Sequence, residues 1–513
     1  MVCLRKVGLI GAECELVSRL LVVRRFNFTK QFDNQVAKHW MFVVKYAHVR
    51  LGWSQLHTVN SFMVDQGEQM TTLDSHSKRT VNRRVRRSAV ALLAACAVFA
   101  AACGSDKKDT AGTAVPTGTA APTGTAAPTG TAAPTGSAAA PTGDPINVMT
   151  VTTLNAAGPT YENIANTAKA YEKYINARGG IAGRPLNVTV CDEQFDPAVA
   201  TTCARSAVEG KMVSIVGSFT FFAESIVPVI AQSKITWFGE CCPITPSELT
   251  SPDSFPIGNQ PMYAVGAVSQ AVKDGCKKIN AVIIDGAQIF IPPMENAMKA
   301  LGMTFGAEVI LPPTSQDYSA EVAQATGGGA DCVIGIISET PYTTWNTAWK
   351  QSGTTARQYG PQGNLNEVSA KGAEDATNGD IIAGMYPDIS TAPWAEYRKA
   401  LDEAGLDTTK LDYNSLGGMG TWAAFVAFTQ IAKTIDGTID AASFYDAASK
   451  TSKLDLNGMV PVLDFTKEWT GGLDGYQRLF NRSVVFSKLE KGKVVPLTTD
   501  FEDVSDLAMG KAP

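Results

Sequence analysis

The chain has 513 residues, of which 45% are hydrophobic and 18% are charged, values that are ordinary for a soluble globular protein with room for two or three domains. Lys and Arg outnumber Asp and Glu by 15 to 6 in the first 102 residues but are outnumbered 29 to 43 in the rest, and an acidic main body argues against a nucleic-acid partner. All four histidines lie in the first 80 residues, which leaves the body without a histidine base, nucleophile partner or metal ligand.

Residues 1–80 show short apolar runs, scattered arginines and no sustained hydrophobic period. They contain no run of 18 apolar residues, so we expect no membrane span there. The segment that follows has the features of a signal peptide, which belongs at the start of a protein. We therefore expect translation to begin near Met70 or Val81, and residues 1–80 to be a mis-annotated or unstructured extension.

Residues 81–103 are predicted to be a lipoprotein signal peptide. Four arginines between positions 83 and 87 form a basic start, and residues 88–99 form an apolar stretch of the usual length. Residues 100–103, with the sequence A-A-A-C, resemble the lipobox of bacterial lipoproteins, in which the cysteine is lipidated and becomes the mature N-terminus. A second match ends at Cys96 but leaves an apolar stretch of only about eight residues, so Cys103 is the preferred lipidation site. A plain secretory peptide or a buried helix is the alternative.

Residues 104–144 are predicted to be a linker. The sequence A-P-T-G-T-A repeats with a period of six from Ala121 through Ala138, with imperfect copies on both sides. Small residues, proline and glycine bury too little apolar area to fold. A flexible chain of this length reaches roughly 35 Å on average, which suits a tether that holds a domain away from a membrane.

The body, residues 145–513, alternates apolar runs of strand length with segments of helical period. In its first part we expect strands over 145–154, 186–190, 213–216 and 235–238 and helices over 161–178, 198–208 and 221–233. In its second part we expect strands over 279–284, 309–311 and 333–337 and helices over 263–272, 294–301 and 342–350. In the remainder we expect helices over 394–404, 422–435 and 441–448 and a hairpin of 483–487 with 494–497. Such alternation predicts an α/β fold with two similar lobes, each built on a parallel sheet.

Two turns after strands are candidate ligand sites, because ligands of parallel sheets bind where the strands end. The first turn is Ser218, Phe219 and Thr220, and the second is residues 239–242, G-E-C-C. The first also opens the expected helix 221–233, whose free N–H groups would favour an anion. The alternative is that Ser218 and Thr220 only cap that helix, and the two roles are compatible.

Six cysteines follow Cys103, and an exported domain permits disulfides among them. Cys191 ends the second expected strand and Cys203 lies on the next helix, so we predict this pair. Cys276 and Cys332 each precede a strand of the second lobe and are predicted to form another. Cys241 and Cys242 are left either as a strained vicinal disulfide beside the ligand or as buried thiols. No pattern of four thiolates at zinc spacing occurs.

A family resemblance rests on three segments of the body. Residues 170–185 have the sequence A-Y-E-K-Y-I-N-A-R-G-G-I-A-G-R-P, and residues 191–197 have C-D-E-Q-F-D-P. Together with V-G-S at 216–218, they resemble the solute-binding proteins of ABC importers in the branched-chain amino acid-binding class, in which these segments read I-N-A-x-G-G-I-x-G-R-P, D-D-x-x-D-P and a ligand loop. The resemblance covers nearly all of residues 145–490.

The resemblance implies the two-lobed type I periplasmic-binding-protein fold, in which three hinge strands join the lobes and a ligand is enclosed between them. Lobe 1 would comprise about 145–260 and 388–464, and lobe 2 about 261–387 and 465–513. The hinges would lie near 258–261, 385–388 and 463–467. The implied partners are a small molecule, an ABC permease and, through the lipid anchor, the outer face of the cytoplasmic membrane. The protein would be an exported monomer that needs no cofactor or metal.

Two departures from the family pattern bear on the ligand. Amino-acid-binding members often hold the ammonium group with an acidic residue in a G-P-E-G turn, where this chain has Gln362. They also commonly have a tyrosine after the second-lobe aspartate, where this chain has Gly286 after Asp285. A more neutral, apolar pocket disfavours an unpaired ammonium. We therefore expect a small apolar or aromatic carboxylate, or an amide. The alternative is an amino acid, with Glu339 or Glu240 as its counter-charge.

The candidate ligand-binding residues follow from these turns and from the resemblance: Asn155, Ser218, Phe219, Thr220, Glu240, Cys241, Gln288, Ile289, Glu339 and Gln362. A sensor of the same fold without transport is the second functional hypothesis. An enzyme is the third, and it is disfavoured because neither a G-x-G-x-x-G turn after the first strand nor a phosphate-binding Walker sequence occurs. We predict no catalytic residues.

Overall fold

The computed structural model describes residues 140–156, 160–406 and 412–512. All described residues belong to one compact unit, Pro128–Pro513. The predicted signal peptide, its lipidation site Cys103 and most of the linker lie outside the described residues. Among the described helices, none has both the length and the apolar character that crossing a membrane requires.

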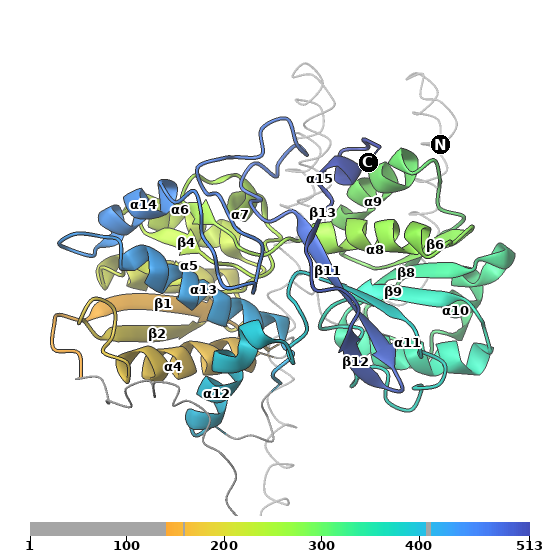
Figure 1. Cartoon of the computed structure of the whole chain (residues 1–513), viewed down its shortest axis with the longest axis horizontal. Coiled ribbons are helices and arrows are strands. Elements are labelled where there is room, and N and C mark those ends of the chain that lie inside the picture. The colour runs from red at the N-terminus through yellow and green to blue at the C-terminus, as the bar shows by residue number, and fades with distance from the viewer. Residues whose placement is uncertain (1–139, 157–159, 407–411, 513) are drawn as a thin grey trace, which may run out of the picture. The chain divides into compact units, whose positions relative to one another are not determined.

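The first lobe is built on a five-stranded parallel sheet with the order β2-β1-β3-β4-β5 (Figure 1). Its strands are β1 Ile146–Thr152, β2 Leu186–Asp192, β3 Ser214–Val216, β4 Thr236–Phe238 and β5 Ser254–Phe255. Its helices are α4 Glu162–Asn176, α5 Pro197–Glu209, η4 Ala223–Ser225, α6 Val227–Ala231, α7 Pro246–Thr250, η7 Ala392–Trp394, α12 Ala395–Glu403, α13 Leu416–Ala432 and α14 Ala441–Ser449.

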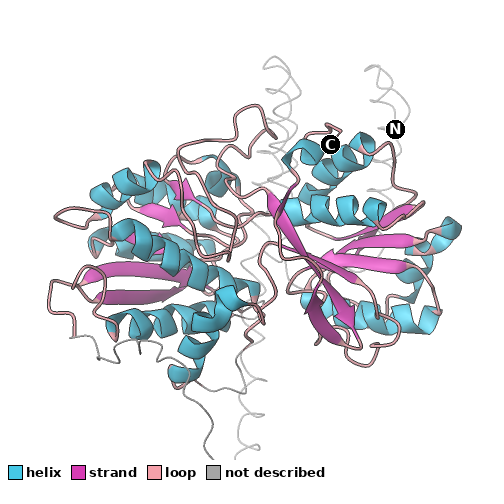
Figure 2. Cartoon of the chain, in the orientation of Figure 1, coloured by secondary structure: helices cyan, strands magenta, loops and turns pink. Residues whose placement is uncertain are grey.

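The second lobe is built on a mixed sheet with the order β12-β11-β10-β9-β8-β6-β7, and β13 pairs with β11 (Figure 2). Strands β7, β6, β8, β9 and β10 are parallel, whereas β11 and β12 form an antiparallel hairpin. Its strands are β6 Ile279–Ile284, β7 Glu308–Leu311, β8 Cys332–Ile336, β9 Arg357–Pro361, β10 Ile381–Gly384, β11 Ser483–Glu490, β12 Lys493–Pro496 and β13 Glu502–Asp503. Its helices are α8 Met262–Lys273, η5 Gln288–Phe290, α9 Ile291–Ala300, α10 Ser319–Ala325, η6 Gly327–Gly329, α11 Glu339–Ser352 and α15 Ser505–Ala508. The predicted α/β class with parallel sheets is confirmed.

Alternate residues of the central strands bury their side chains in different cores, as expected for strands covered on both faces. In β1, Ile146 and Val148 pack with residues of α4 and α13, whereas Met149 and Val151 pack with residues of α5 and α6. The second sheet follows the same rule. Residues of β6 and β8 alternate between a core shared with α8 and α9 and a core shared with α10 and α11.

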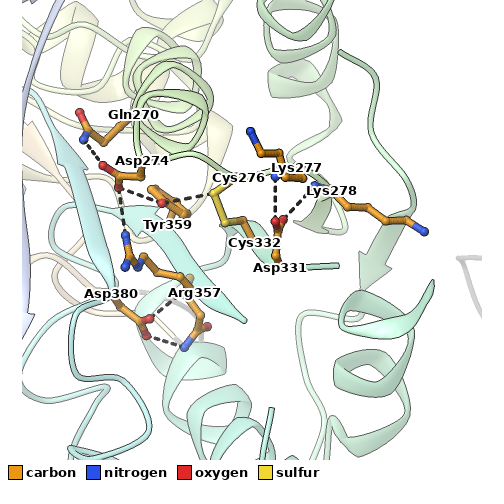
Figure 3. The surroundings of a disulfide bond; sticks show 11 residues. Gln270, Asp274, Cys276, Lys277, Lys278, Asp331, Cys332, Arg357, Tyr359 and Asp380 are labelled. Atoms are coloured by element: carbon orange, nitrogen blue, oxygen red, sulfur yellow. Dashed lines mark hydrogen bonds and ion pairs between the residues drawn. A yellow bond between two sulfur atoms is a disulfide. The ribbon is translucent and has the colours of Figure 1, made fainter. Parts of the chain in front are cut away.

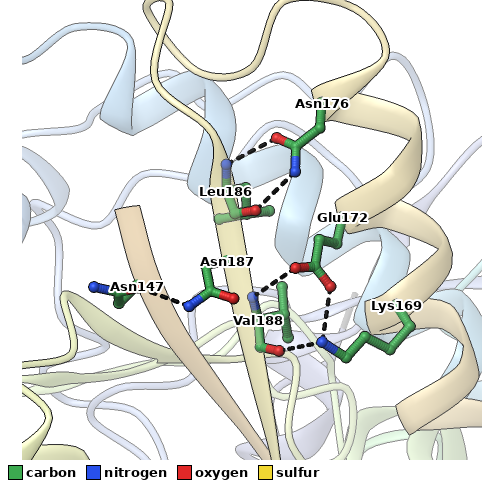
Figure 4. Close-up of polar contacts among 7 residues, drawn as sticks. All are labelled: Asn147, Lys169, Glu172, Asn176, Leu186, Asn187 and Val188. Carbon is green, nitrogen blue, oxygen red and sulfur yellow. Dashed lines mark hydrogen bonds and ion pairs between the residues drawn. The ribbon is translucent and has the colours of Figure 1, made fainter. Parts of the chain in front are cut away.

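The segment that carries the family resemblance fixes α4 to β2 (Figure 4). The side chain of Asn176 accepts a hydrogen bond from the N–H of Leu186 and donates one to its carbonyl, both at 2.8 Å. One turn earlier, Glu172 accepts from the N–H of Val188 at 3.3 Å. Between helix and strand, Gly180 has φ +70°, and a Cβ there would lie 2.1 Å from the carbonyl oxygen of Arg184. The motif is therefore a helix-to-strand connection that only glycine and asparagine satisfy.

The structure differs from the predicted helices and strands in three respects. The expected helix 221–233 is two short pieces, η4 and α6, because Pro228 lies in the first turn of α6, a position typical of a helix start. Helix α13 begins at Leu416 rather than near 422. Strands β5, β9 and β10 and helices α7 and α10 were not predicted.

The third crossing between the lobes lies beyond the expected 463–467. The ring of Phe465 packs 5.4 Å from that of Phe255 in β5, and Arg478 donates to the carbonyl of Ser254 at 2.9 Å. Residues 465–480 therefore belong to the first lobe, and the chain crosses immediately before β11. The first crossing lies between β5 and α8, and the second follows β10.

Both predicted disulfides are present. Cys191–Cys203 joins the end of β2 to α5, with Cα atoms 5.9 Å apart. Cys276–Cys332 joins the segment before β6 to β8, with Cα atoms 6.0 Å apart (Figure 3). Beside the second bond, Asp331 accepts hydrogen bonds from the N–H groups of Lys277 and Lys278, each at 2.8 Å.

We expect the two disulfides to stabilise the protein to different degrees. They separate their cysteines by 12 and 56 residues, and a longer closed loop removes more entropy from the unfolded chain. Replacing both cysteines of a bond by serine should lower the free energy of unfolding by about 3 kcal/mol for Cys191–Cys203 and about 4 kcal/mol for Cys276–Cys332. Urea unfolding of the exported protein measures both. A larger loss for the shorter loop would contradict the entropic explanation.

Candidate ligand-binding site

The turn after β3 is held from two sides by hydrogen bonds. The hydroxyl of Ser218 accepts from the N–H of Val151 in β1 at 2.9 Å. The hydroxyl of Thr421 in α13 donates to the carbonyl of Gly217 at 2.7 Å. Gly217 has φ +61°, and a Cβ there would lie 2.9 Å from the Cα of Thr421, so the turn requires glycine. Ser218 is buried and keeps its own hydroxyl hydrogen for another acceptor.

Neither Ser218 nor Thr220 caps a helix. The hydroxyl of Thr220 accepts from the N–H of Phe222 at 3.0 Å, which closes a local turn, and η4 has no side-chain cap. The helix pieces that follow contain three and five residues, so the long helix expected to favour an anion is not there. A ligand contact at this turn therefore depends on side chains such as Ser218.

Glu193 is a residue of this edge that the sequence analysis did not single out. It follows β2, and its Oε1 accepts a hydrogen bond from the hydroxyl of Thr153, the residue after β1. Its Oε2 is buried without a hydrogen-bond partner among the described residues. Burial raises the pKa of its carboxyl group, against hydrogen bonds from Thr153 and Thr220 that lower it. The only sequence signal was its place in the C-D-E-Q-F-D-P segment.

Aromatic side chains gather beside the same turn. The ring of Phe219 lies 4.9 Å from that of Tyr161 and 5.4 Å from that of Phe221, each edge to face. Phe195 lies 5.6 Å from Phe221 and is held in a left-handed conformation with φ 55°. Phe195 and Phe221 are 38% and 43% exposed, which is high for such large apolar groups. Apolar surface is thus available next to Ser218.

Glu240, at the end of β4, is directed into the first lobe. Its Oε1 accepts from the hydroxyl of Ser254 in β5 at 3.0 Å, and its Oε2 is buried without a partner among the described residues. Burial, and then the neighbouring carboxyl group of Glu248, raise the pKa of Glu240 well above its ordinary value. The raised pKa disfavours the charged form of this side chain, which makes it a poor counter-charge for an ammonium group.

Gln362 follows β9, and its amide group is bonded to the second crossing. Its Nε2 donates to the carbonyl of Tyr386 at 3.0 Å, and its Oε1 accepts from the N–H groups of Met385 and Tyr386, both at 3.1 Å. Three of the four hydrogen bonds that the amide is able to make are thus used within the protein. A carboxylate at this position would keep the two accepting bonds but would face the carbonyl of Tyr386.

The remaining candidates are tied to their own loops. Asn155, after β1, donates to Asp192 at 2.7 Å. Gln288, after β6, donates to Asp285 at 2.7 Å, and its neighbour Ile289 is 47% exposed. Glu339, at the start of α11, is partly buried and accepts from Asn366 at 2.8 Å.

The structure therefore groups the candidates in separate sets. In the first lobe, Ser218, Phe219, Thr220 and Glu193 lie together where β1, β2 and β3 end. In the second lobe, Gln288 and Ile289 lie after β6, Glu339 after β8 and Gln362 after β9. Each of these positions is at the carboxyl end of a parallel strand, the edge where ligands of such sheets bind.

A metal site finds no support in the part of the chain that the structure describes. Its one group of three possible ligands within 4.8 Å of one another consists of Cys276, Asp331 and Cys332. The two sulfur atoms are joined in a disulfide and Asp331 is bonded to backbone N–H groups, as Figure 3 shows. These three residues therefore have a structural role.

Comparison with known proteins gives a family and a fold. The profile of the periplasmic binding protein family matches residues 146–472, which is more than half of the chain. No curated protein matches the chain.

Three solved structures illustrate the fold. A branched-chain amino acid ABC transporter protein from Thermus thermophilus with bound valine is 16% identical over 71% of this chain and 97% of its own, with a TM-score of 0.57. A solute-binding protein from R. palustris in complex with 4-hydroxybenzoate is 17% identical over 70% and 97%, with a TM-score of 0.55. A fatty acid ABC transporter substrate-binding protein from Thermomonospora curvata is 17% identical over 72% and 95%, with a TM-score of 0.55.

We expect Gln362→Glu to weaken the second crossing. The substitution removes the donor to the Tyr386 carbonyl and places a carboxylate against it, which should lower the free energy of unfolding by about 1–3 kcal/mol. Urea unfolding measures the change, with Gln324→Glu, an exposed residue of α10, as the matched control. If Gln362→Glu leaves stability unchanged and creates binding of leucine, the side chain faces the ligand instead.

Glu240 should make the protein less stable as pH rises. A group whose pKa is higher in the folded than in the unfolded protein contributes stability below its unfolded pKa, and this stability is lost as pH rises through the folded value. The stability of the wild type should therefore fall above about pH 4.5. Glu240→Gln imitates the neutral acid, so its midpoint of urea unfolding should depend less on pH. The prediction is wrong if stability changes with pH in the same way in Glu240→Gln, in the exposed control Glu209→Gln and in the wild type.

Proposed function

Because the chain belongs to the periplasmic binding protein family, in which a solute is bound outside the cytoplasm, we propose that it delivers a small apolar or aromatic carboxylate, or an amide, to an ABC importer. The ligand class is inferred mainly from the hydrogen bonds that the amide group of Gln362 makes within the protein. Its amide is bonded to the second crossing, at the position where amino-acid-binding relatives often have an acid.

The other groups at the strand ends support the same ligand class. The hydroxyl of Ser218 offers a hydrogen bond to a carboxylate or a carbonyl oxygen, and Phe219 and Phe221 offer apolar surface. The unpaired Oε2 of Glu193 suits an N–H or O–H group of the ligand. Burial raises the pKa of Glu240, and its Oε1 is bonded to Ser254, which weakens the amino-acid alternative. Glu339 remains the counter-charge that this alternative would use.

Solved neighbours of the same fold are named for ligands of both classes. One was solved with 4-hydroxybenzoate and one with valine, and a third is named for fatty acids. At 16–17% identity the fold is shared and the ligand is not transferred, so the choice depends on the residues of this chain. An aromatic carboxylate with a hydroxyl group would use Ser218, the phenylalanines and Glu193 together.

The transport role includes a membrane anchor. Lipidation of Cys103 would fix the protein to the outer face of the cytoplasmic membrane, and the linker would let the body reach a permease. The protein would act by binding alone, without catalysis. A sensor lipoprotein of the same fold is the second candidate. An adjacent gene for a permease or ATPase favours transport, and one for a membrane kinase favours sensing.

A thermal-shift panel tests the ligand class. Each amino acid is paired with its deaminated carboxylate and its amide, and 4-hydroxybenzoate is included. A ligand at about 100 times its dissociation constant adds about 2.7 kcal/mol, a shift of a few degrees for a protein of this size. We expect carboxylates or amides to raise the Tm, and leucine, isoleucine and valine to leave it unchanged.

A matched pair of variants tests whether the ligand binds at Ser218. Ser218→Ala should abolish the ligand-induced shift, and Ser233→Ala, at an exposed serine after α6, should retain it. The readout is the shift and not the absolute Tm, because Ser218 also satisfies the N–H of Val151. A shift with leucine alone would contradict the proposed class and make Glu339 the residue to replace next.

A further inference from the structure

Two adjacent cysteines at the ligand edge play no part in the function proposed above. Cys241 and Cys242 follow β4, and their sulfur atoms lie 2.6 Å apart as thiols. The other cysteines in the described part of the chain, Cys191 with Cys203 and Cys276 with Cys332, are joined in disulfides. The domain therefore has features of a protein from an oxidising compartment, in which a pair of thiols in contact is a substrate for oxidation.

The pair is built into the junction of three segments. A Cβ on Gly258, in the first crossing, would lie 1.5 Å from the carbonyl oxygen of Cys241. A Cβ on Gly420, in α13, would lie 2.3 Å from the Cβ of Cys241 and 2.8 Å from the hydroxyl oxygen of Tyr386. Tyr386 belongs to the second crossing. Cys241 thus contacts the first crossing and α13, and no larger residue than glycine fits at either contact.

Hydrogen bonds couple the same turn to the first crossing. The carbonyl oxygen of Glu240 accepts from the N–H of Ile257 at 3.3 Å and from the N–H of Gly258 at 3.0 Å. A change in backbone conformation at residues 240–242 therefore moves or breaks the bonds that hold residues 257 and 258. The crossing is where the chain passes from the first lobe to the second, so the change reaches the hinge.

We propose that Cys241 and Cys242 form a reversible vicinal disulfide that alters the first crossing and, with it, the affinity for the ligand. The effect on affinity rests on the proposed binding function, whereas the disulfide does not.

The oxidant is another disulfide, of an oxidoreductase or a small thiol. The thiolate of Cys242, the less buried of the two, attacks one sulfur of that disulfide and releases the first thiol. Cys241 then loses its proton and attacks the sulfur of Cys242, which forms the vicinal bond and releases the second thiol. Two S–H bonds become one S–S bond, and the two electrons and two protons pass to the oxidant. The hydrogen bond with Cys242 and burial raise the pKa of Cys241, so Cys241 is poorly suited to make the first attack.

Geometry makes this bond easier to reduce than the other two. Neighbouring Cα atoms across a trans peptide are about 3.8 Å apart, whereas disulfides usually join Cα atoms about 4.4–6.8 Å apart. Cys191–Cys203 and Cys276–Cys332 lie within that range, at 5.9 and 6.0 Å. A vicinal bond closes a ring that contains the intervening peptide, and the resulting strain favours reduction. The Cys241–Cys242 pair is thus suited to reversible oxidation, whereas the other two disulfides are expected to stay closed.

Peptide mapping in glutathione buffers tests the bond without a ligand. The exported protein is equilibrated at a series of ratios of reduced to oxidised glutathione, then denatured and alkylated. In oxidising buffer, the peptide with Cys241 and Cys242 should be unalkylated and lighter by two hydrogen atoms than the dithiol form. In mildly reducing buffer it should carry two alkyl groups while the other two disulfides stay closed. Alkylation of both residues at every ratio would overturn the proposal, as would opening only together with the other bonds.

Hydrogen exchange and binding test the consequence. Residues 256–261 should exchange at different rates in the oxidised and reduced protein, and the affinity for 4-hydroxybenzoate should differ at least about fivefold between them. Cys242→Ser should remove the dependence on redox buffer from both readings.

The outcomes separate the two proposals. Equal exchange in both states overturns the switch even where the disulfide forms. If 4-hydroxybenzoate and the rest of the panel fail to bind, the proposed ligand class fails, and the mapping and exchange results still decide the switch. If Cys242→Ser does not fold, the redox series on the wild type decides it.

Discussion

The contact of α13 with the ends of β3 and β4 is the constraint on which the first-lobe site depends. Gly217 and Gly239 end those strands with φ +61° and +79°, and a Cβ at Gly239 would lie 2.4 Å from the Cβ of Ala424. The helix lies directly on both turns, so there is no room for a side chain at either glycine. This contact sets the position of Ser218 after β3 and of Cys241 after β4. Replacing either glycine would displace the turn and the helix together.

The crossings between the lobes are held by amide side chains. Asn259 of the first crossing donates to the carbonyl of Ser483, and Asn481 of the third donates to the carbonyl of Ile257 at 3.0 Å. Gln362 bonds the second crossing in the same manner. Primary amides both donate and accept, so they satisfy backbone groups that leave the sheets at a bend. These local bonds hold backbone at places where a sheet ladder does not continue.

Sequence reasoning succeeded where local pattern decides structure. The helix over Glu162–Asn176 has its apolar residues on one face, and the strands of both sheets are apolar runs between glycine-rich turns, so their type and order were predictable. The two disulfides followed from that order. The start of α13 was missed because Gly417, Gly418 and Gly420 have low helix propensity, and only tertiary contacts with Ile164, Tyr397 and Cys241 explain them.

The candidate site was less predictable, because its side-chain partners come from distant parts of the chain. The positions of Ser218 and Glu339 after strands followed from the sequence, but the position of Gln362 after β9 and its bonds to Tyr386 did not. Likewise, Glu240 and Glu193 are both glutamates after strands, and nothing local distinguishes them. The third crossing was misplaced because residues 465–480 lack regular elements, and only the contacts of Phe465 and Arg478 assign them to the first lobe.

Three glutamates of the first lobe are buried, and two of them, Glu193 and Glu240, differ in the hydrogen bonds that oppose the effect of burial. Glu240 accepts a hydrogen bond from Ser254 and lies near the carboxyl group of Glu248, and ionising it would leave a charge far from water. Glu193 lies among threonines at the ends of β1 and β3, beside Tyr161, and hydrogen bonds oppose the effect of its burial. A ligand that offers this carboxylate an uncharged donor satisfies the buried Oε2 without adding a second buried charge, which favours a hydroxyl or amide group over an ammonium at this position.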